Sequence, residues 1–199
     1  FLEKIQPYPV RYIYGSLPDE PGLRSGAWLP PVDEKAIEDH VRQAQAQKVG
    51  FLYVLNAVCW GNQEFTAQGQ HILVDRLGWL ESIGAAGAVV ANPYIIEFIR
   101  NRFPVLKVYV STLSNVNSLD KALFYREMGC EGLHLPEYVN RDFKLLHEMK
   151  KAVTSDISLT VNLCCLMQCP LRDYHANFIS HSGESLDRGC YVDYSLMKC

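Results

Sequence analysis

The sequence predicts an α/β protein: a parallel (β/α) barrel of the TIM type that is incomplete at both ends. Three observations lead to this prediction. Short apolar runs alternate with amphipathic stretches through residues 10–162. The stretches between the runs are long enough to form the crossover helices that parallel strands need. No GxGxxG motif follows any run, so the dinucleotide fingerprint of the alternative fold, an open doubly wound sheet, is missing.

The predicted strands are short apolar runs bounded by turn-forming residues, beginning with "VRYIYG" and continuing with "GFLYVLN" and "AGAVVAN". Six such units fit an eight-fold barrel that lacks about one strand at each end. The chain opens at Phe1 and stops at Cys199 inside a motif, and we therefore expect a fragment of a longer protein. The six strands are predicted at residues 10–15, 50–56, 86–92, 106–112, 131–136 and 157–162.

Helix start and stop signals lie between these runs. Asp33 is placed as an N-cap or first-turn acid, and Pro93 stands at a first helical turn, where its missing N–H costs nothing. Gly84 and Gly129 each follow an amphipathic stretch and suit a left-handed C-terminal cap. The helices are predicted at residues 32–47, 66–84, 93–103, 116–129 and 140–153.

The composition is that of a soluble globular protein. A formal net charge of -3 does not favour capture of a nucleic acid by charge, although it does not exclude RNA as a substrate. No apolar run approaches the roughly 20 residues of a membrane span, and no signal peptide is seen. We expect a cytoplasmic protein, with residues 1–163 as the barrel core and residues 164–199 as a cysteine-rich segment packed on the C-terminal rim of the same domain.

Polar residues follow several of the predicted strands. In a parallel barrel the functional groups gather at the carboxyl ends of the strands, so these residues are candidates for substrate binding. The alternative is that asparagine and serine only cap turns and helices there. Two histidines near the cysteines are either substrate contacts or structural residues. The candidate substrate-binding residues are Asn56, Asn92, Ser111, Glu137, Asn162, His175 and His181.

Five of the seven cysteines lie between residues 164 and 199, a clustering that favours metal over disulfides. Three residues separate Cys165 from Cys169, so both can reach one metal, and Cys190 and Cys199 follow in the same segment. Four thiolates suit zinc or an iron–sulfur cluster. Structural zinc sites use tight ligand pairs, whereas eight residues separate Cys190 from Cys199. This looser spacing favours a cluster, and zinc stays the alternative.

The other cysteines are given structural roles. Cys164 neighbours Cys165 and points to the opposite side in extended backbone, so it is interpreted as a packing residue or a spare ligand. Cys130 is interpreted as a small core residue. Cys59 follows the second strand on the functional rim and is interpreted as structural, with a reactive thiol as the alternative.

Several phrases of the chain resemble peptidase family U32, also called the collagenase-like proteases. They are "YPVRYIYGSLP", "FLYVLNAVCWGNQEFT", "VVANPYIIEFIR", "LPEYVNRDFKLL" and, most specifically, "NLCCLMQCPLRDYHANFISH" with "GCYVDYSLMKC". The resemblance implies a barrel-like domain and, in some members, a four-iron, four-sulfur cluster that supports oxygen-independent hydroxylation in ubiquinone biosynthesis or of RNA. The matching ligands are Cys165, Cys169, Cys190 and Cys199. The better-known members carry an "HGALC"-like stretch where this chain has "VNLCC", so the substrate stays open.

Three functions compete at this point. The leading one is a cluster-dependent enzyme that hydroxylates or otherwise modifies a small organic molecule or an RNA base, alone or with a protein partner of the same family. The second is a peptidase, although the sequence shows no HExxH motif and no recognisable Ser/His/Asp set. The third is a non-enzymatic subunit in which a cluster stabilises a docking surface.

Overall fold

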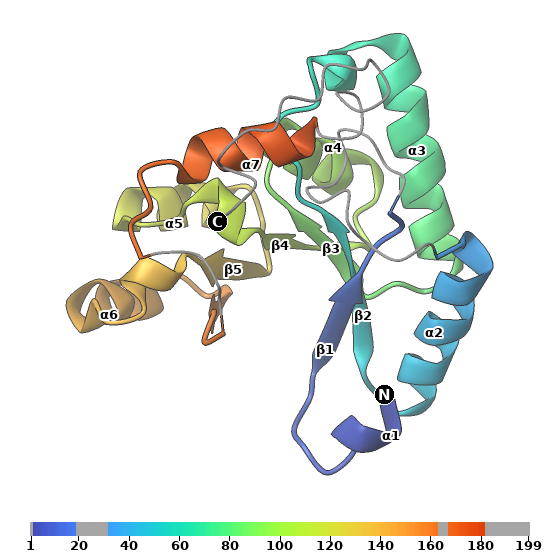
Figure 1. The fold of residues 1–199 in the computed structure, drawn as a ribbon, viewed down its shortest axis with the longest axis horizontal. Coiled ribbons are helices and arrows are strands. Elements are labelled where there is room, and N and C mark those ends of the chain that lie inside the picture. The colour runs from blue at the N-terminus through green and yellow to red at the C-terminus, as the bar shows by residue number, and fades with distance from the viewer. Residues whose placement is uncertain (1, 19–31, 163–166, 182–199) are drawn as a thin grey trace.

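Six parallel strands form one curved sheet in which sequence order and spatial order coincide, from β1 to β6. The computed structural model describes residues 2–18, 32–162 and 167–181 (Figure 1). The prediction of an incomplete parallel barrel is confirmed, and so is each predicted strand, although most of the strands are only four residues long. The strands are β1 (Tyr12–Gly15), β2 (Gly50–Leu55), β3 (Gly87–Val90), β4 (Lys107–Val110), β5 (Gly132–Leu135) and β6 (Asp156–Leu159).

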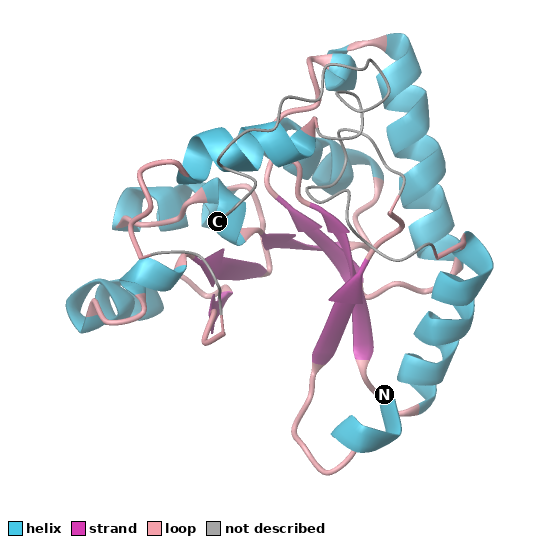
Figure 2. Ribbon diagram, viewed as in Figure 1, coloured by secondary structure: helices cyan, strands magenta, loops and turns pink. Residues whose placement is uncertain are grey.

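A helix follows each of the first five strands and packs on the convex side of the sheet, as Figure 2 shows. The signals read from the sequence have the expected geometry. Asp33 accepts a hydrogen bond from the Ala36 backbone N–H at 2.8 Å, and Gly84 and Gly129 have φ of 73° and 79°. These helices are α2 (Glu34–Ala46), α3 (Ala67–Ser82), α4 (Pro93–Arg102), α5 (Leu119–Glu127) and α6 (Phe143–Ala152).

Two further helices, α1 (Leu2–Ile5) and α7 (Arg172–Ser180), were not expected from the sequence. No helix was predicted in the cysteine-rich segment after β6, and α7 corrects that prediction for its described part. Ala176 and Ser180, one helical turn apart, are both buried. Helix α7 therefore forms because one face finds a surface to pack against, and not because its sequence is strongly periodic. Short 3₁₀ turns precede α3, α5 and α6, at Gln63–Phe65, Thr112–Ser114 and Glu137–Val139.

The main hydrophobic core lies between the convex side of the sheet and the helices. Phe51, Tyr53 and Leu55 alternate along β2 and belong to this core, where they are at most 3 % exposed. Strand residues with the opposite parity face the concave side, which we call the lumen. Leu52, Val89 and Tyr109 form a small buried cluster there. Apart from the exposed Lys107 at the start of β4, both faces of β2, β3 and β4 are thus apolar, as expected for inner strands of a parallel sheet.

Glycines facing the lumen make room for tyrosine rings. Gly50 is paired in register with Tyr12, and Gly132 with Tyr109. A Cβ atom on Gly50 would lie 2.6 Å from Tyr12 Cδ1, and one on Gly132 would lie 2.3 Å from Tyr109 Cδ1. The two rings meet edge to face with their centroids 5.4 Å apart, and Tyr109 donates a 3.0 Å hydrogen bond to the Tyr12 hydroxyl. The positions of the two rings thus depend on the absence of side chains at the paired glycines.

Gly132→Ala is expected to destabilise the protein by about 1–3 kcal/mol, because the new methyl group overlaps a ring that is 3 % exposed and cannot swing into solvent. Urea unfolding followed by circular dichroism measures the change. Gly78→Ala in α3 is the matched control, since a Cβ there meets nothing within 4 Å. This control is expected to stabilise the helix by up to about 1 kcal/mol. Equal stability of Gly132→Ala and the unaltered chain would contradict the packing described for the lumen.

Candidate functional site

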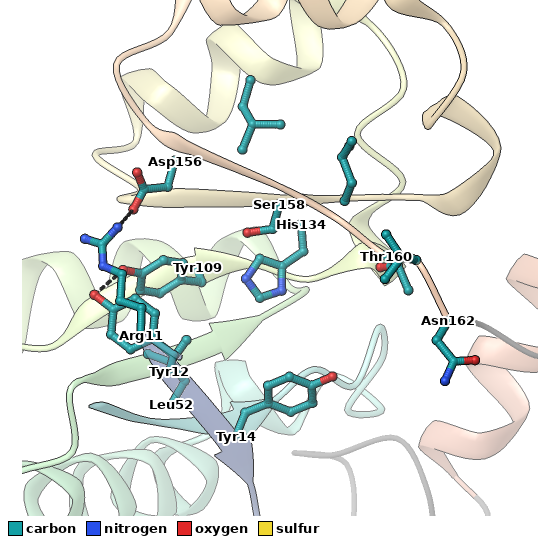
Figure 3. A pocket seen from close by; sticks show the side chains of 13 residues that line it. Arg11, Tyr12, Tyr14, Leu52, Tyr109, His134, Asp156, Ser158, Thr160 and Asn162 are labelled. Carbon is teal, nitrogen blue, oxygen red and sulfur yellow. Dashed lines mark hydrogen bonds and ion pairs between the residues drawn. The ribbon is translucent and has the colours of Figure 1, made fainter. Parts of the chain in front are cut away.

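The lumen contains an open cavity of about 580 Å³ (Figure 3). It extends from the amino ends of β1 and β6 to Asn162, which lies beyond the carboxyl end of β6. Asn162 was expected to contact substrate, and the structure places it on the cavity wall. The lining residues are Arg11, Tyr12, Tyr14, Leu52, Tyr109, His134, Asp156, Ile157, Ser158, Leu159, Thr160, Val161 and Asn162.

An ion pair and a tyrosine pair connect distant strands at the amino end of the cavity. The Arg11 guanidinium lies 2.6 Å from the Asp156 carboxylate, so β1 and β6, the two edge strands of the sheet, are linked across the lumen. The two side chains are 64 % and 47 % exposed, and the pair therefore contributes little to stability. Its consequence for binding is electrostatic, because the two charged residues of the cavity neutralise each other.

Burial sets the protonation of two groups in the lumen. Desolvation lowers the pKa of His134 below its ordinary value, so its imidazole is neutral at neutral pH. Burial, followed by the hydrogen bond to Tyr12, raises the pKa of Tyr109, so its hydroxyl keeps its proton. The two rings are neighbours, with centroids 5.8 Å apart. The cavity thus presents uncharged donors and acceptors.

Helix α7 crosses the carboxyl ends of the strands and is anchored near both of its ends (Figure 1). At its first residue, Arg172 Nη1 contacts both carboxylate oxygens of Glu137 at 2.5 and 2.6 Å, and Nη2 donates to the Thr112 carbonyl at 3.3 Å. At its last residue, the Ser180 hydroxyl accepts a 3.2 Å bond from the Val58 N–H. The Arg172 and Glu137 side chains are only 13 % and 10 % exposed. A mostly buried ion pair therefore holds α7 on the rim.

Cys169 lies three residues before α7 and is brought to the same rim. It is half-buried, it is a free thiol, and its carbonyl accepts a 3.2 Å bond from the Arg172 N–H. The other three expected ligands, Cys165, Cys190 and Cys199, lie outside the described residues, as does Cys164. Within residues 2–18, 32–162 and 167–181, no group of three metal-ligating side chains could hold a metal ion. The ligand set therefore stays a prediction.

Two candidate substrate-binding residues cap helical turns. The Asn92 side chain accepts from the Tyr94 N–H at 2.9 Å, and Ser111 accepts from the Leu113 N–H at 3.2 Å. Asn92 also donates to Glu64 Oε1 at 2.8 Å, and Glu64, which is 5 % exposed, leaves its second oxygen without a hydrogen bond.

Three further candidates, Asn56, His175 and His181, are half-buried on or near the rim. His181 is the C-cap residue that follows α7, and its Cε1 atom lies 3.7 Å from the position that a Cβ atom on Gly61 would occupy. Cys59 Sγ accepts a 3.4 Å bond from the Gly61 N–H, so Cys59 and His181 approach the same residue. Cys130, expected to be a core residue, is buried, and desolvation raises the pKa of its thiol to about 12.

The sequence did not reveal Arg172, Glu64 or the lumen side chains of β5 as site residues. One signal was available for β6. Asp156, Ser158, Thr160 and Asn162 are polar at every second position, which in a closed or nearly closed barrel indicates a strand with polar residues on the inside. No comparable local signal exists for Arg172, whose partner Glu137 lies 35 residues away.

Taken together, the fold and the site define a TIM-type barrel protein with a lumen cavity and a helix latched over the carboxyl ends of its strands. The sequence model of peptidase family U32 matches residues 21–197, and the chain belongs to that family. It is 31 % identical over 188 residues to a protein named uncharacterized protease MJ1657 from Methanocaldococcus jannaschii. That match covers 94 % of this chain and 55 % of the relative, so the chain spans about half the relative's length.

A solved structure, that of the U32 peptidase Mk0906, superposes with a TM-score of 0.76 at 20 % sequence identity. The superposition covers 96 % of this chain and 75 % of that one. At this identity the likeness concerns the fold. Among the described residues, no helix is long and apolar enough to cross a membrane.

Arg172→Met is expected to destabilise the protein by about 3 kcal/mol, because it leaves the buried Glu137 carboxylate without its partner. Urea unfolding measures the loss, and limited proteolysis is expected to show earlier cleavage next to α7. Arg42→Met is the control, since the Arg42–Asp39 pair is 74 % and 40 % exposed and its loss is expected to cost less than about 1 kcal/mol. If both variants unfold at the same urea concentration, the Arg172–Glu137 ion pair has no structural role.

Proposed function

We propose that this chain is the barrel region of an iron–sulfur enzyme that hydroxylates or otherwise modifies a small organic molecule or an RNA base. A four-iron, four-sulfur cluster on Cys165, Cys169, Cys190 and Cys199 is its cofactor in this proposal. The main observation in support of this proposal is the ion pair between Arg172 and Glu137. It holds α7, and with it Cys169, at the carboxyl ends of the strands. That rim is where barrel enzymes hold their catalytic groups.

The described residues are compatible with such a cofactor. Cys169 is free, half-buried and next to the amino end of a nine-residue helix, whose partial positive charge favours an anionic, thiolate-bound group nearby. Four cysteine thiolates are the usual ligands of such clusters, and zinc is the alternative metal for the same donors. When bound, the cluster supplies one-electron transfer.

The protein's own residues bind and orient the substrate in this proposal. The cavity ends at Asn162, which precedes Cys165 by three residues in the sequence, so a molecule in the lumen can contact the end of the described segment that leads to that cysteine. Neutral His134 can donate or accept a hydrogen bond, and the Tyr109 hydroxyl, whose proton is donated to Tyr12, can accept one, so both offer hydrogen bonds without adding charge. We further propose a cytoplasmic location, since thiols that bind an iron–sulfur cluster need a reducing compartment. We also propose that the protein acts alone or with a protein partner of the same family.

Anaerobic purification followed by iron and acid-labile sulfide analysis tests the cofactor. We expect about four of each per chain. Cys169→Ser is expected to lose most of both. Cys59→Ser is the matched control: it removes another half-buried free thiol, outside the ligand set, and is expected to retain the iron. A colourless protein with about one zinc per chain would contradict the proposal, and so would iron binding that does not depend on Cys169.

A peptidase is the second candidate, and one observation favours it besides the names of the related proteins. Cys59 and His181 both approach Gly61, one through a hydrogen bond and the other through its ring. A half-buried thiol near a histidine is the minimal arrangement for a cysteine nucleophile and its base. Helix α7 is shared by the two candidate functions. Cys169, the proposed cluster ligand, precedes its first turn, and His181, the candidate base, caps its carboxyl end.

The peptidase candidate makes a separate prediction. Cleavage of an unfolded protein substrate such as casein should survive treatment with a metal chelator and fall at least about a hundredfold in Cys59→Ala and in His181→Ala. His175→Ala, which changes another half-buried histidine of α7, serves as the control and should cleave normally. Cleavage that persists in Cys59→Ala would rule out this role for the pair.

A further inference from the structure

We propose that the lumen cavity binds an uncharged, sugar-like ring, that is, a pyranose or a cyclic polyol of similar size. The inference deepens the proposed function by naming its substrate class, and it rests on that proposal. The observations that support it do not involve the cysteines. They are the hydrogen-bonding wall of the cavity, the aromatic wall opposite to it and the balance of charge between them.

One wall of the cavity is built from side chains that can both donate and accept hydrogen bonds. His134 pairs in register with Ser158, and Thr160 and Asn162 continue the same face beyond the strand (Figure 3). In the described part of the chain, none of these four side chains forms a hydrogen bond to another residue. Hydroxyl groups also donate and accept, so a ligand with several hydroxyls satisfies this wall in more than one orientation.

The opposite wall is aromatic. Tyr12 and Tyr14 of β1 line this wall together with Leu52 of β2, whereas Tyr109 of β4 lies beside His134, with ring centroids 5.8 Å apart. Tyr14 is 72 % exposed, so much of its ring lies open to the cavity and to solvent. One apolar wall and one hydroxyl-matching wall fit a pyranose, which has a C–H face and a rim of hydroxyls. A nucleobase instead has two stacking faces and an edge with a fixed donor and acceptor pattern.

The charges of the cavity favour a neutral ligand. Among its lining residues, only Arg11 and Asp156 carry a formal charge, and they form a 2.6 Å ion pair at the amino end. While the pair is formed the two charges cancel, so the cavity presents no unpaired charge to a phosphate, a carboxylate or an ammonium group. The volume of about 580 Å³ lies within the range of small-molecule sites and exceeds what one sugar ring needs.

Saturation-transfer NMR with methyl β-D-glucopyranoside tests the inference on this chain, with uridine and glucose 6-phosphate as competitors. We expect transfer to the glucoside and little effect of either competitor. Tyr14→Ala and Ser158→Ala should each weaken glucoside binding about tenfold, the effect of losing one stacking or hydrogen-bonding partner. Tyr8→Ala removes a tyrosine that is 66 % exposed and outside the cavity, and should bind normally.

Absence of transfer to the glucoside would overturn the inference, as would transfer that Tyr14→Ala and Ser158→Ala leave unchanged, or displacement of the glucoside by uridine at lower concentration. The result is separable from the cofactor test. A chain that holds iron through Cys169 but binds no glucoside fails this inference alone. A chain that binds glucoside through Tyr14 and Ser158 but holds no iron fails the proposed function and keeps the lumen site.

Discussion

The buried ion pair between Arg172 and Glu137 joins the βα-repeat sheet to the segment that carries Cys169. Removing both charges from water is costly, and a well-packed apolar pair at the same place would often be as stable. Breaking the pair is more costly still, because one charge would stay buried alone. The pair therefore fixes where α7 lies more than it adds to stability. The proposed function needs α7 to lie on the rim, between the carboxyl ends of β2 and β5.

A second constraint shapes the lumen. Gly50 and Gly132 leave space that the rings of Tyr12 and Tyr109 fill at the amino end of the lumen. Farther along, His134 of β5 and Ser158 of β6 line the cavity. The tyrosine rings thus pack against each other and also line the cavity at its amino end. Polar side chains line the rest of the cavity, and α7 with Cys169 lies at the carboxyl ends of the strands.

The sequence predicted the repeating architecture well because each βα unit has local signals. These signals are the apolar runs, the Asp33 cap, and the glycines at 84 and 129. Each one determines the backbone conformation only within a few residues of its own position. The candidate site could not be predicted in the same way, because it depends on contacts between distant parts of the chain. Asn92 and Ser111 were correctly placed after strands, but local capping uses their side chains. Asn162 reaches the cavity because the inward parity of β6 continues past its last residue.

Helix α7 could not be read from its own residues. It has nine residues, follows Cys169 and Pro170, and buries only Ala176 and Ser180. A segment of this length is marginal as an isolated helix and forms here on a tertiary surface. Its anchors, Glu137, Thr112 and Val58, come from three different loops. The same dependence explains why the partners of α7 could not be predicted from the sequence, and the grouping of the four cysteines stays a prediction.

The most direct measurement of the central claim is a crystal structure of anaerobically purified protein, with anomalous data collected on both sides of the iron absorption edge. The arrangement described here predicts an iron signal bonded to Cys169 Sγ, beside the amino end of α7 and on the carboxyl side of the sheet. An anomalous signal that appears only at the zinc edge, or iron bound away from Cys169, would contradict it.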